Sequence, residues 1–428
     1  MNAAFLIERL SHYQWLGPII DEALRQGWEV EVWHDYNQPR AGLKGYLFPD
    51  LESVPTFQHG RPVYKRYHSA AELAGWIKQH TVDVILSLVS PARYVASPSA
   101  TPGPRWVSVQ SGVDFFLRNK PEWLFSCDAA VLYNNWWVSW GAAYLQEQRV
   151  PDAGDGFSRQ LAAKAVPTGF PELDQCRLID PTEVRRRWKI PPSQPVVVLS
   201  PFPTSGSLTF WSRKIYLEPN PLRQALHVLA HRRFHYWPQV RHGWHDAAVA
   251  RAIRAFCDRN GAYLLVKSRA KIPIPLYLEA VADQCLYDES YYPATVLEAL
   301  SIANLCISFY STIVMEAIAL GVPHLCVTFS GEDYTDGNPQ ASADFKLFYH
   351  TQEGGFFRFR GASTPMAIPE VITTLPEKRL ADFALDPEAR AVYVRKFLGD
   401  DDGQSSGRVV EVMQRLAQGT AASMAAAR

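Results

Sequence analysis

The sequence predicts an α/β protein built on two parallel sheets, and three observations support this prediction. In the stretch Tyr287–Phe329, the apolar runs Leu305–Ser308 and His324–Thr328 flank a segment with helical spacing, which is a strand–helix–strand pattern. The start of the chain repeats the pattern, because Ala3–Ile7 and Trp28–Trp33 enclose another predicted helix. The length of 428 residues suits two domains of ordinary size.

The remaining elements continue this alternation in each half of the chain. Apolar runs predict buried strands at three places in the first half and two in the second, namely Val82–Leu88, Trp106–Gln110, Ala129–Tyr133, Pro195–Ser200 and Ala262–Lys267. A further loop-and-strand passage is expected at Thr351–Phe359. The first strand–helix turn lacks the Gly-x-Gly-x-x-Gly fingerprint, which argues against a nicotinamide or flavin dinucleotide site there.

A Gly- and Pro-rich segment, Val166–Asp174, marks the predicted boundary between the halves. The chain from Pro376 onward is predicted to be helical. We therefore expect a first domain at 1–174, a second at 175–375, and C-terminal helices at 376–428 that pack back on the first domain.

The composition describes a globular protein with no strong overall field. Hydrophobic residues make up 47% of the chain, which is enough for a sizeable core, and the formal net charge is zero. A neutral protein is not drawn as a whole to nucleic acid, so we expect no nucleic-acid partner. The six cysteines include no Cys-x-x-Cys pair, and no apolar run is long enough for a signal peptide or a membrane span, so a cytoplasmic location is expected.

The turn before the helix in Tyr287–Phe329 is the best candidate for a binding site. Ser308, Ser311 and Thr312 place hydroxyl groups where a helix N-terminus is predicted, and the free backbone N–H groups of such a terminus favour an anion. Glu316 follows one turn later and is expected to reach a ribose hydroxyl. The same residue types also serve as ordinary N-caps, and this interpretation stays open.

The phrases Tyr-Tyr-Pro, Leu-Glu-Ala-Leu, Ala-Asn-Leu-Cys-Ile-Ser, Ser-Thr, Glu-Ala and Leu-Gly-Val-Pro follow one another between Tyr291 and Pro323. In this order they resemble the nucleotide-binding half of GT-B glycosyltransferases. The closest resemblance is to the CDP-glycerol polyol-phosphate transferases, the capsule polysaccharide transferases and the UDP-GlcNAc 2-epimerase-like proteins. Val166–Asp174 and Phe397–Arg408 also resemble elements of this group, although the latter fits a capped loop before an amphipathic helix equally well.

The resemblance implies two Rossmann-like domains that face each other across a cleft. It implies an enzyme that transfers a sugar, or a polyol phosphate, from a nucleotide-activated donor to a cell-envelope glycan or a lipid-linked acceptor. A 2-epimerase-like reaction on a UDP-sugar and a nucleotide-sugar-binding protein without turnover remain alternatives. The nucleotide sugar is a co-substrate, and no cofactor and no essential metal are expected, because protein cations can replace a metal in the GT-B arrangement.

Lys267 and Arg269 are predicted to be counter-charges for the donor phosphates, because the carboxyl ends of parallel strands face the ligand crevice. In the resembling group this strand commonly ends in a Lys-x-His-Pro-like phrase, whose histidine is not matched here. A solvated strand end is the alternative interpretation for both residues.

Three residues in loops after predicted strands are candidates for the base that deprotonates the acceptor: Glu8, His12 and Asp114. The resembling group often carries His-Gly at a place where this chain has Ser111 followed by glycine. This departure leaves the assignment of the base open, and each candidate can equally be a cap or a surface residue.

The segment Pro201–His245 interleaves aromatic residues with arginines and histidines. Such side chains suit a membrane interface, where each basic residue adds roughly 1 kcal/mol near anionic lipid. We expect this segment either to bring the protein onto the inner face of a membrane or an amphipathic acceptor, or to fill a core with its aromatic side chains.

Overall fold

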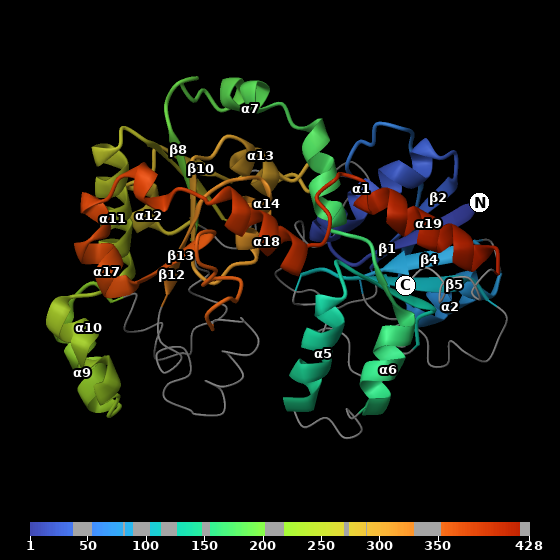
Figure 1. Ribbon diagram of the computed structural model, residues 1–428, viewed down its shortest axis with the longest axis horizontal. Coiled ribbons are helices and arrows are strands. Elements are labelled where there is room, and N and C mark those ends of the chain that lie inside the picture. The colour runs from blue at the N-terminus through green and yellow to red at the C-terminus, as the bar shows by residue number, and fades with distance from the viewer. Residues whose placement is uncertain are drawn as a thin grey trace. The chain divides into compact units, whose positions relative to one another are not determined.

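The computed structural model describes residues 1–36, 54–79, 82–88, 103–112, 126–147, 155–201, 218–268, 274–287, 289–328 and 352–419. The chain divides into two compact units (Figure 1). The first contains Met1–Leu178, Ser290–Thr295 and Val394–Arg428, and the second contains Ile179–Glu289 and Val296–Tyr393. The chain thus leaves the first unit after Leu178 and returns to it twice, and the short return at Ser290–Thr295 has no counterpart in the sequence prediction. The face-to-face arrangement of the units stays a prediction.

The first unit is built on a seven-stranded parallel sheet with the order β3-β2-β1-β4-β5-β6-β7. Five of its strands are those predicted from apolar runs. The outer strands β3 and β7 were not predicted, since edge strands need not be apolar on both faces. The strands are β1 (Asn2–Ile7), β2 (Glu29–Asp35), β3 (Val63–Tyr67), β4 (Val84–Ser87), β5 (Arg105–Val109), β6 (Ala129–Leu132) and β7 (Ala165–Pro167).

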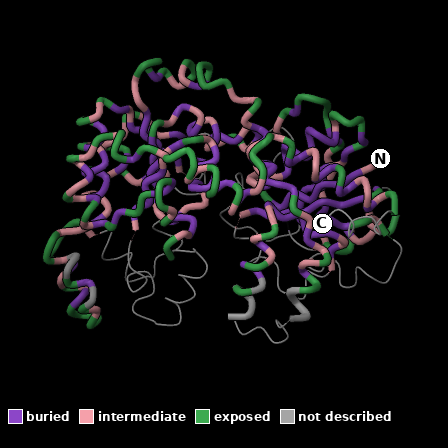
Figure 2. Tube along the Cα trace, in the orientation of Figure 1, coloured by how far each residue is buried: buried purple, intermediate pink, exposed green. Residues whose placement is uncertain are grey.

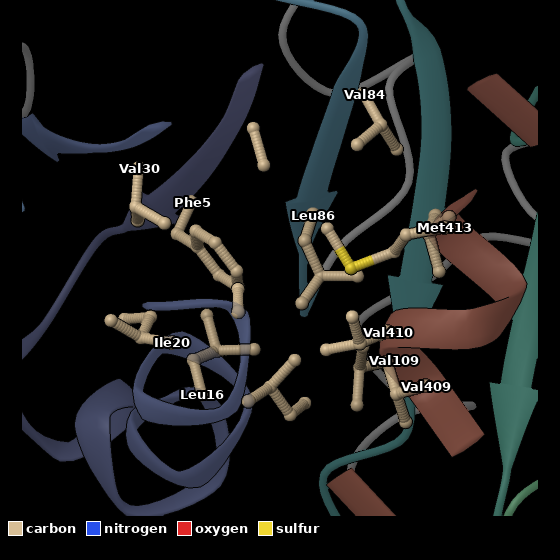
Figure 3. Packing of buried hydrophobic residues seen from close by; sticks show 14 of the residues in the cluster. Phe5, Leu16, Ile20, Val30, Val84, Leu86, Val109, Val409, Val410 and Met413 are labelled. Carbon is tan, nitrogen blue, oxygen red and sulfur yellow. The ribbon is translucent and has the colours of Figure 1, made fainter. Parts of the chain in front are cut away.

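Helices from both ends of the chain cover one face of this sheet. Leu16 and Ile20 of α1 pack on Phe5, Val30 and Leu86 of the sheet, and Val409, Val410 and Met413 of α19 pack on the same cluster (Figure 3). The predicted return of the C-terminal helix to the first unit is therefore confirmed. The helices of this unit are η1 (Leu10–His12), α1 (Tyr13–Arg25), α2 (Ala70–Lys78), α5 (Trp136–Glu147), α6 (Asp155–Lys164), η3 (Pro171–Leu178) and α19 (Ser405–Ala417).

The second unit is built on a six-stranded parallel sheet with the order β10-β9-β8-β11-β12-β13. The strand expected at Thr351–Phe359 was placed wrongly: residues 352–357 form turns around Gly354, whose φ of 75° suits glycine, and the last strand is β13. The strands are β8 (Val196–Ser200), β9 (Tyr263–Lys267), β10 (Gln284–Leu286), β11 (Leu305–Ser308), β12 (His324–Thr328) and β13 (Ser363–Ala367).

Both faces of the second sheet are covered, so its central strands are buried throughout (Figure 2). Helices α11 and α17 cover one face, and α7 with α13 covers the other. The helices are α7 (Pro181–Arg187), α9 (Pro221–Ala230), η4 (Phe234–Tyr236), α10 (Trp237–His242), α11 (Asp246–Arg259), α12 (Leu276–Glu279), α13 (Thr295–Ser301), α14 (Ile313–Ala319), α17 (Ile368–Thr373), η5 (Leu375–Glu377), η6 (Leu380–Phe383) and α18 (Pro387–Phe397), the last of which ends in the first unit.

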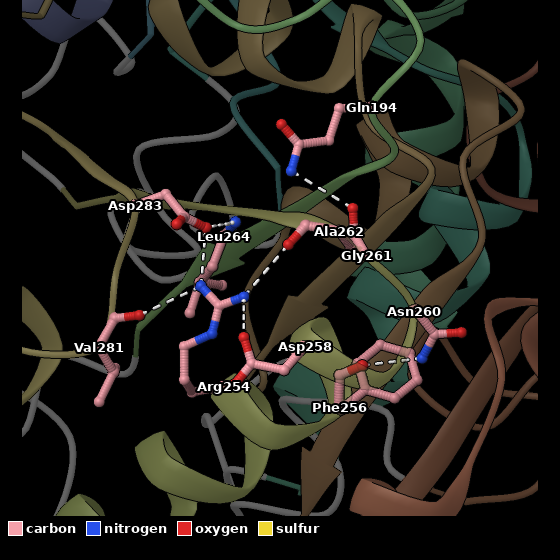
Figure 4. Close-up of polar contacts among 10 residues, drawn as sticks. All are labelled: Gln194, Arg254, Phe256, Asp258, Asn260, Gly261, Ala262, Leu264, Val281 and Asp283. Atoms are coloured by element: carbon pink, nitrogen blue, oxygen red, sulfur yellow. Dashed lines mark hydrogen bonds and ion pairs between the residues drawn. The ribbon is translucent and has the colours of Figure 1, made fainter.

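Arg254 fastens α11 to the edge of the second sheet (Figure 4). Its guanidinium donates to the Asp283 carboxylate at 2.7 Å and to the Ala262 carbonyl at 3.3 Å, and it forms an ion pair with Asp258 at 2.8 Å. Asp283 in turn accepts the backbone N–H of Leu264 at 2.6 Å. A single arginine thereby contacts groups from α11, from the residue before β9 and from the turn before β10.

We expect Arg254→Leu to lower the free energy of unfolding by about 1–3 kcal/mol, because the buried Ala262 carbonyl loses this donor and the Asp283 carboxylate keeps only the Leu264 N–H. Arg251→Leu is the matched control, since Arg251 is exposed on the same helix and its replacement should stay within about 0.5 kcal/mol. Urea unfolding of both variants checks this. Equal midpoints for the two variants would show that the network contributes no stability.

The two motifs Val166–Asp174 and Phe397–Arg408 pack against each other in the first unit. Arg408 donates through Nε to the Thr168 carbonyl at 2.8 Å and forms an ion pair with Asp402 at 2.8 Å. The Asp174 carboxylate accepts the Ser406 backbone N–H at 2.5 Å, at the start of α19. Burial raises the pKa of Asp174, and this hydrogen bond opposes the shift. Both motifs therefore hold α19 in place.

Candidate functional site

Both sheets have the same topology, and its switch points position the candidate residues. In each sheet the first strand lies in the middle, the next two strands extend to one side, and the fourth strand lies on its other side. In open parallel sheets, ligands bind outside the carboxyl ends of the strands where the order reverses. The switch point lies between β1 and β4 in the first unit, and between β8 and β11 in the second.

Ser308, the last residue of β11, lies at the second switch point and pairs in register with Ser200 of β8. Its hydroxyl is fully buried and contacts Nε2 of His324 at 2.8 Å, while Nδ1 of His324 contacts the Ser363 hydroxyl at 2.9 Å. Ser363 donates to the Phe357 carbonyl at 3.2 Å, so it accepts from Nδ1 and leaves Nε2 to accept from Ser308. Ser308 is thus anchored to β12 and β13.

His324 stays neutral in this chain of hydrogen bonds. Burial lowers its pKa to about 3, because the protonated ring would lose its hydration there. A neutral imidazole with one donor and one acceptor fixes the direction of the hydrogen bonds from Ser308 to Ser363. These hydrogen bonds therefore hold the carboxyl end of β11 in place, directly before the turn that leads to α14.

The turn after β11 contains a strained residue. Tyr310 has a φ of 36°, a conformation that side chains with Cβ rarely adopt, and its ring packs edge-on against Phe357 at 5.2 Å between centroids. Thr312 precedes α14, and its side chain makes no capping hydrogen bond. Ser311 accepts the Ile313 N–H only at 3.5 Å. The half-buried hydroxyls of Ser311 and Thr312 are thus little used by the helix itself.

Glu316 is buried on α14. Burial raises the pKa of the Cys306 thiol and of the Tyr393 phenol, and the carboxylate of Glu316 raises both further, so it lies near these two groups. Tyr393 also donates to the Phe356 carbonyl at 3.3 Å. The predicted contact of Glu316 with a ribose stays a prediction.

Lys267 lies at the carboxyl end of β9 and is buried. Its ammonium forms an ion pair with Glu289 at 2.9 Å and donates to the Ser268 carbonyl at 2.5 Å. A solvated strand end therefore does not describe Lys267, and its charge has a carboxylate partner. Arg269 lies outside the described residues. The role of both as phosphate counter-charges stays a prediction.

At the first switch point, Glu8 directly follows β1, and His12 ends the 3-10 helix behind it. Both are buried, and His12 accepts the Glu8 backbone N–H through Nδ1 at 3.4 Å. Asp114, the third candidate base, lies outside the described residues. The structure thus brings Glu8 and His12 together beside the switch point, and their role as bases stays a prediction.

Two residues that the sequence analysis did not single out lie beside Glu8 and His12. The Tyr13 hydroxyl and Nε2 of His34 are 2.7 Å apart, and His34 pairs in register with Ile7. Burial and then the nearby charge of Arg66 lower the pKa of His34 to about 3, so the ring is neutral. The signal in the sequence was a histidine near the end of a strand in which acidic and apolar residues alternate.

The end of β5 carries a second polar group. Gln110 accepts the Tyr133 N–H at 2.9 Å, and the Tyr133 hydroxyl accepts the Gly112 N–H at 2.7 Å, so the two strand ends are bonded to each other. Between them the Ser111 hydroxyl is buried and has no hydrogen-bond partner among the described residues. That this hydroxyl takes the place of the histidine often found in the resembling group stays a prediction.

The described ranges contain no cluster of three or more His, Cys, Asp or Glu side chains placed to hold a metal ion. None of their helices combines the length and apolar character needed to cross a membrane.

No family model matches the sequence, and no curated protein matches it either. Solved structures match it over nearly the whole chain. A variant of the wall teichoic acid polymerase TagF matches with a TM-score of 0.58 and 10% identity, over 98% of this chain and 89% of that chain. A UDP-GlcNAc 2-epimerase from Neisseria meningitidis, bound to UDP-GlcNAc, matches with a TM-score of 0.51 and 13% identity, over 97% of this chain and 100% of that chain.

The co-structure of S. aureus MnaA with UDP matches with a TM-score of 0.51 and 12% identity, over 97% of each chain. At such low identity the similarity concerns the fold. It agrees with the two parallel-sheet units of seven and six strands and with the C-terminal helix on the first unit. The chain therefore has the GT-B fold.

Proposed function

We propose that this protein is a cytoplasmic GT-B enzyme that transfers a sugar, or a polyol phosphate, from a nucleotide-activated donor to a cell-envelope glycan or a lipid-linked acceptor. One observation carries the proposal. Polar candidate residues follow the strands at the switch point of each sheet, with Glu8 and His12 after β1 and with Ser311 and Thr312 after β11.

The second unit is proposed to hold the donor. Hydroxyls that the helix leaves little used, together with the backbone N–H groups of the turn, suit a phosphate oxygen. Similar proteins support a nucleotide-activated donor as such, since structures with the same fold were solved with UDP, with UDP-GlcNAc and with CDPG. The first unit then supplies the base from Glu8 or His12.

A 2-epimerase-like reaction on a UDP-sugar is the second candidate. The match covers 100% of the epimerase chain from Neisseria meningitidis, whereas it covers 89% of the chain of the TagF variant. Incubation with a nucleotide sugar alone separates the two functions. An epimerase forms an isomer without any acceptor, whereas a transferase releases nucleotide in amounts that depend on the acceptor.

The donor site can be tested with a thermal-shift panel of CMP, CDP, UDP, GDP and TDP, because a ligand that binds the folded state raises its melting temperature. For the nucleotide that binds, we expect Ser311→Ala combined with Thr312→Ala to weaken affinity by about 10- to 100-fold, as measured by calorimetry. Glu316→Gln is expected to weaken it as well.

Thr373→Ala is the matched control, since that hydroxyl is exposed on α17, where it contacts the Pro369 carbonyl at 2.9 Å and the Thr374 hydroxyl at 3.4 Å. It should leave nucleotide affinity unchanged. If the Ser311 and Thr312 variant melts cooperatively and binds with unchanged affinity, the donor does not bind at this turn.

A further inference from the structure

Helix α9 has two apolar faces, and only one is covered. Gln224 and Val228 point into the second unit and are buried. On the opposite side, Leu222, Leu226 and Leu229 form a stripe at helical spacing and are exposed by 74%, 64% and 51%. We call these three leucines the outer stripe. Large apolar side chains gathered on one exposed helix face mark an interaction surface.

The outer stripe continues into the next elements of the chain. Phe234 in η4 and Trp237 at the start of α10 are also exposed, whereas Tyr236 between them is buried and anchors the segment. In the second unit, α9 and α10 stand away from the sheet, so the stripe lies on a projecting part of this unit (Figure 1). Part of the predicted aromatic core of Pro201–His245 is therefore exposed, and residues 202–217 lie outside the described ranges.

Positively charged side chains predominate around the outer stripe. Residues 218–245 contain four arginines and five histidines but a single acidic residue, Glu218, in a chain whose net charge is zero. Arg223 and Arg232 are exposed next to the stripe, at the start and beyond the end of α9. An apolar stripe flanked by arginines is the pattern of a helix that lies in the interface of a membrane.

Charge also decides between possible occupants. In a two-fold dimer of this chain the same arginines would meet one another across the interface, and like charges repel. An anionic bilayer offers the opposite charge to the arginines and an apolar layer to the leucines. We propose that the outer stripe, with Phe234 and Trp237, docks on the surface of anionic lipid bilayers. This inference does not depend on the proposed function.

Vesicle co-sedimentation of the full chain tests the docking. We expect binding to vesicles that contain phosphatidylglycerol, little binding to pure phosphatidylcholine, and release when salt rises from about 0.1 M to about 1 M, where the Debye length falls to about 3 Å. Leu226→Gln combined with Leu229→Gln should weaken binding by at least about tenfold. Arg223→Glu combined with Arg232→Glu should abolish the preference for the anionic lipid.

Leu276→Gln is the matched control, because Leu276 is 82% exposed on α12, away from α9 (Figure 1), and should leave binding unchanged. Melting curves of all variants confirm that they fold. The proposal is overturned if the wild-type chain stays in the supernatant with anionic vesicles at low salt, or if the leucine variant sediments as the wild type does. Sedimentation velocity that shows a dimer lost in the leucine variant would assign the stripe to a second copy instead.

Discussion

Replacing Gly399 with alanine is expected to lower the free energy of unfolding of the first unit by about 2–5 kcal/mol. Gly399 has a φ of 85°, which is costly for any residue with a Cβ. A Cβ added at Gly399 would also lie 2.7 Å from the Tyr133 carbonyl oxygen and 3.4 Å from Cα of Gly169. That oxygen belongs to the backbone and cannot rotate away. The strain and the overlap therefore add.

Gly403→Ala separates these two causes. Gly403 lies in the same loop with a φ of 71°, but nothing lies within 4 Å of an added Cβ, so only the backbone strain of about 1–2 kcal/mol remains. Gly169→Ala should fall between the two, because its φ is 87° and its Cβ would overlap the Ser405 hydroxyl, which is a side-chain group that can rotate away. Urea unfolding followed by tryptophan fluorescence measures all three, since the Trp137 indole donates to the Phe397 carbonyl at 2.7 Å. Equal losses for Gly399→Ala and Gly403→Ala would contradict the packing of the two motifs.

Acid is expected to destabilise both units through one buried histidine in each. His324 and His34 have pKa values lowered to about 3, mainly by burial, whereas an unfolded histidine takes up a proton near about pH 6.5. Between these values the unfolded chain binds one more proton at each site. The contribution of each histidine to the free energy of unfolding is therefore largest above about pH 6.5. It falls by about 1.4 kcal/mol for each pH unit below that value, until the side chain in the folded protein also takes up a proton.

His324→Gln removes this proton uptake in the second unit while keeping a polar side chain beside Ser308 and Ser363. We expect its unfolding free energy to be lower than that of the wild type at neutral pH. Between about pH 6.5 and 4.5 this free energy should fall less steeply than in the wild type, because the variant takes up about one proton fewer on unfolding. His34→Gln should do the same in the first unit. Parallel pH dependences for wild type and His324→Gln, measured by urea unfolding, would rule out a buried neutral His324.

The turn after β11 shows which features the local sequence can predict and which it cannot. The apolar runs of β11 and β12 and the helical spacing between them were sufficient to predict the strand–helix–strand unit, because burial on both faces leaves a strong pattern. The hydroxyls of Ser311 and Thr312 were recognised from the same pattern. The groups that hold Ser308 were not, because they come from later strands: His324 lies 16 residues after Ser308, and Ser363 lies a further 39 residues along the chain.

By itself the sequence determined the two α/β halves and most of the central strands, since each depends on the periodicity of apolar residues within one segment. The return of the last helix was predicted on other grounds, from the two joined α/β halves and a chain end that stays helical past the last strand. Only the tertiary structure decided the partners of polar groups. It paired Lys267 with Glu289, placed His34 against Tyr13 and packed Gly169 on Gly399, all of which join residues distant in the chain. It also decided which side of α9 is buried, because a helix with apolar residues on two faces does not specify which one meets the core.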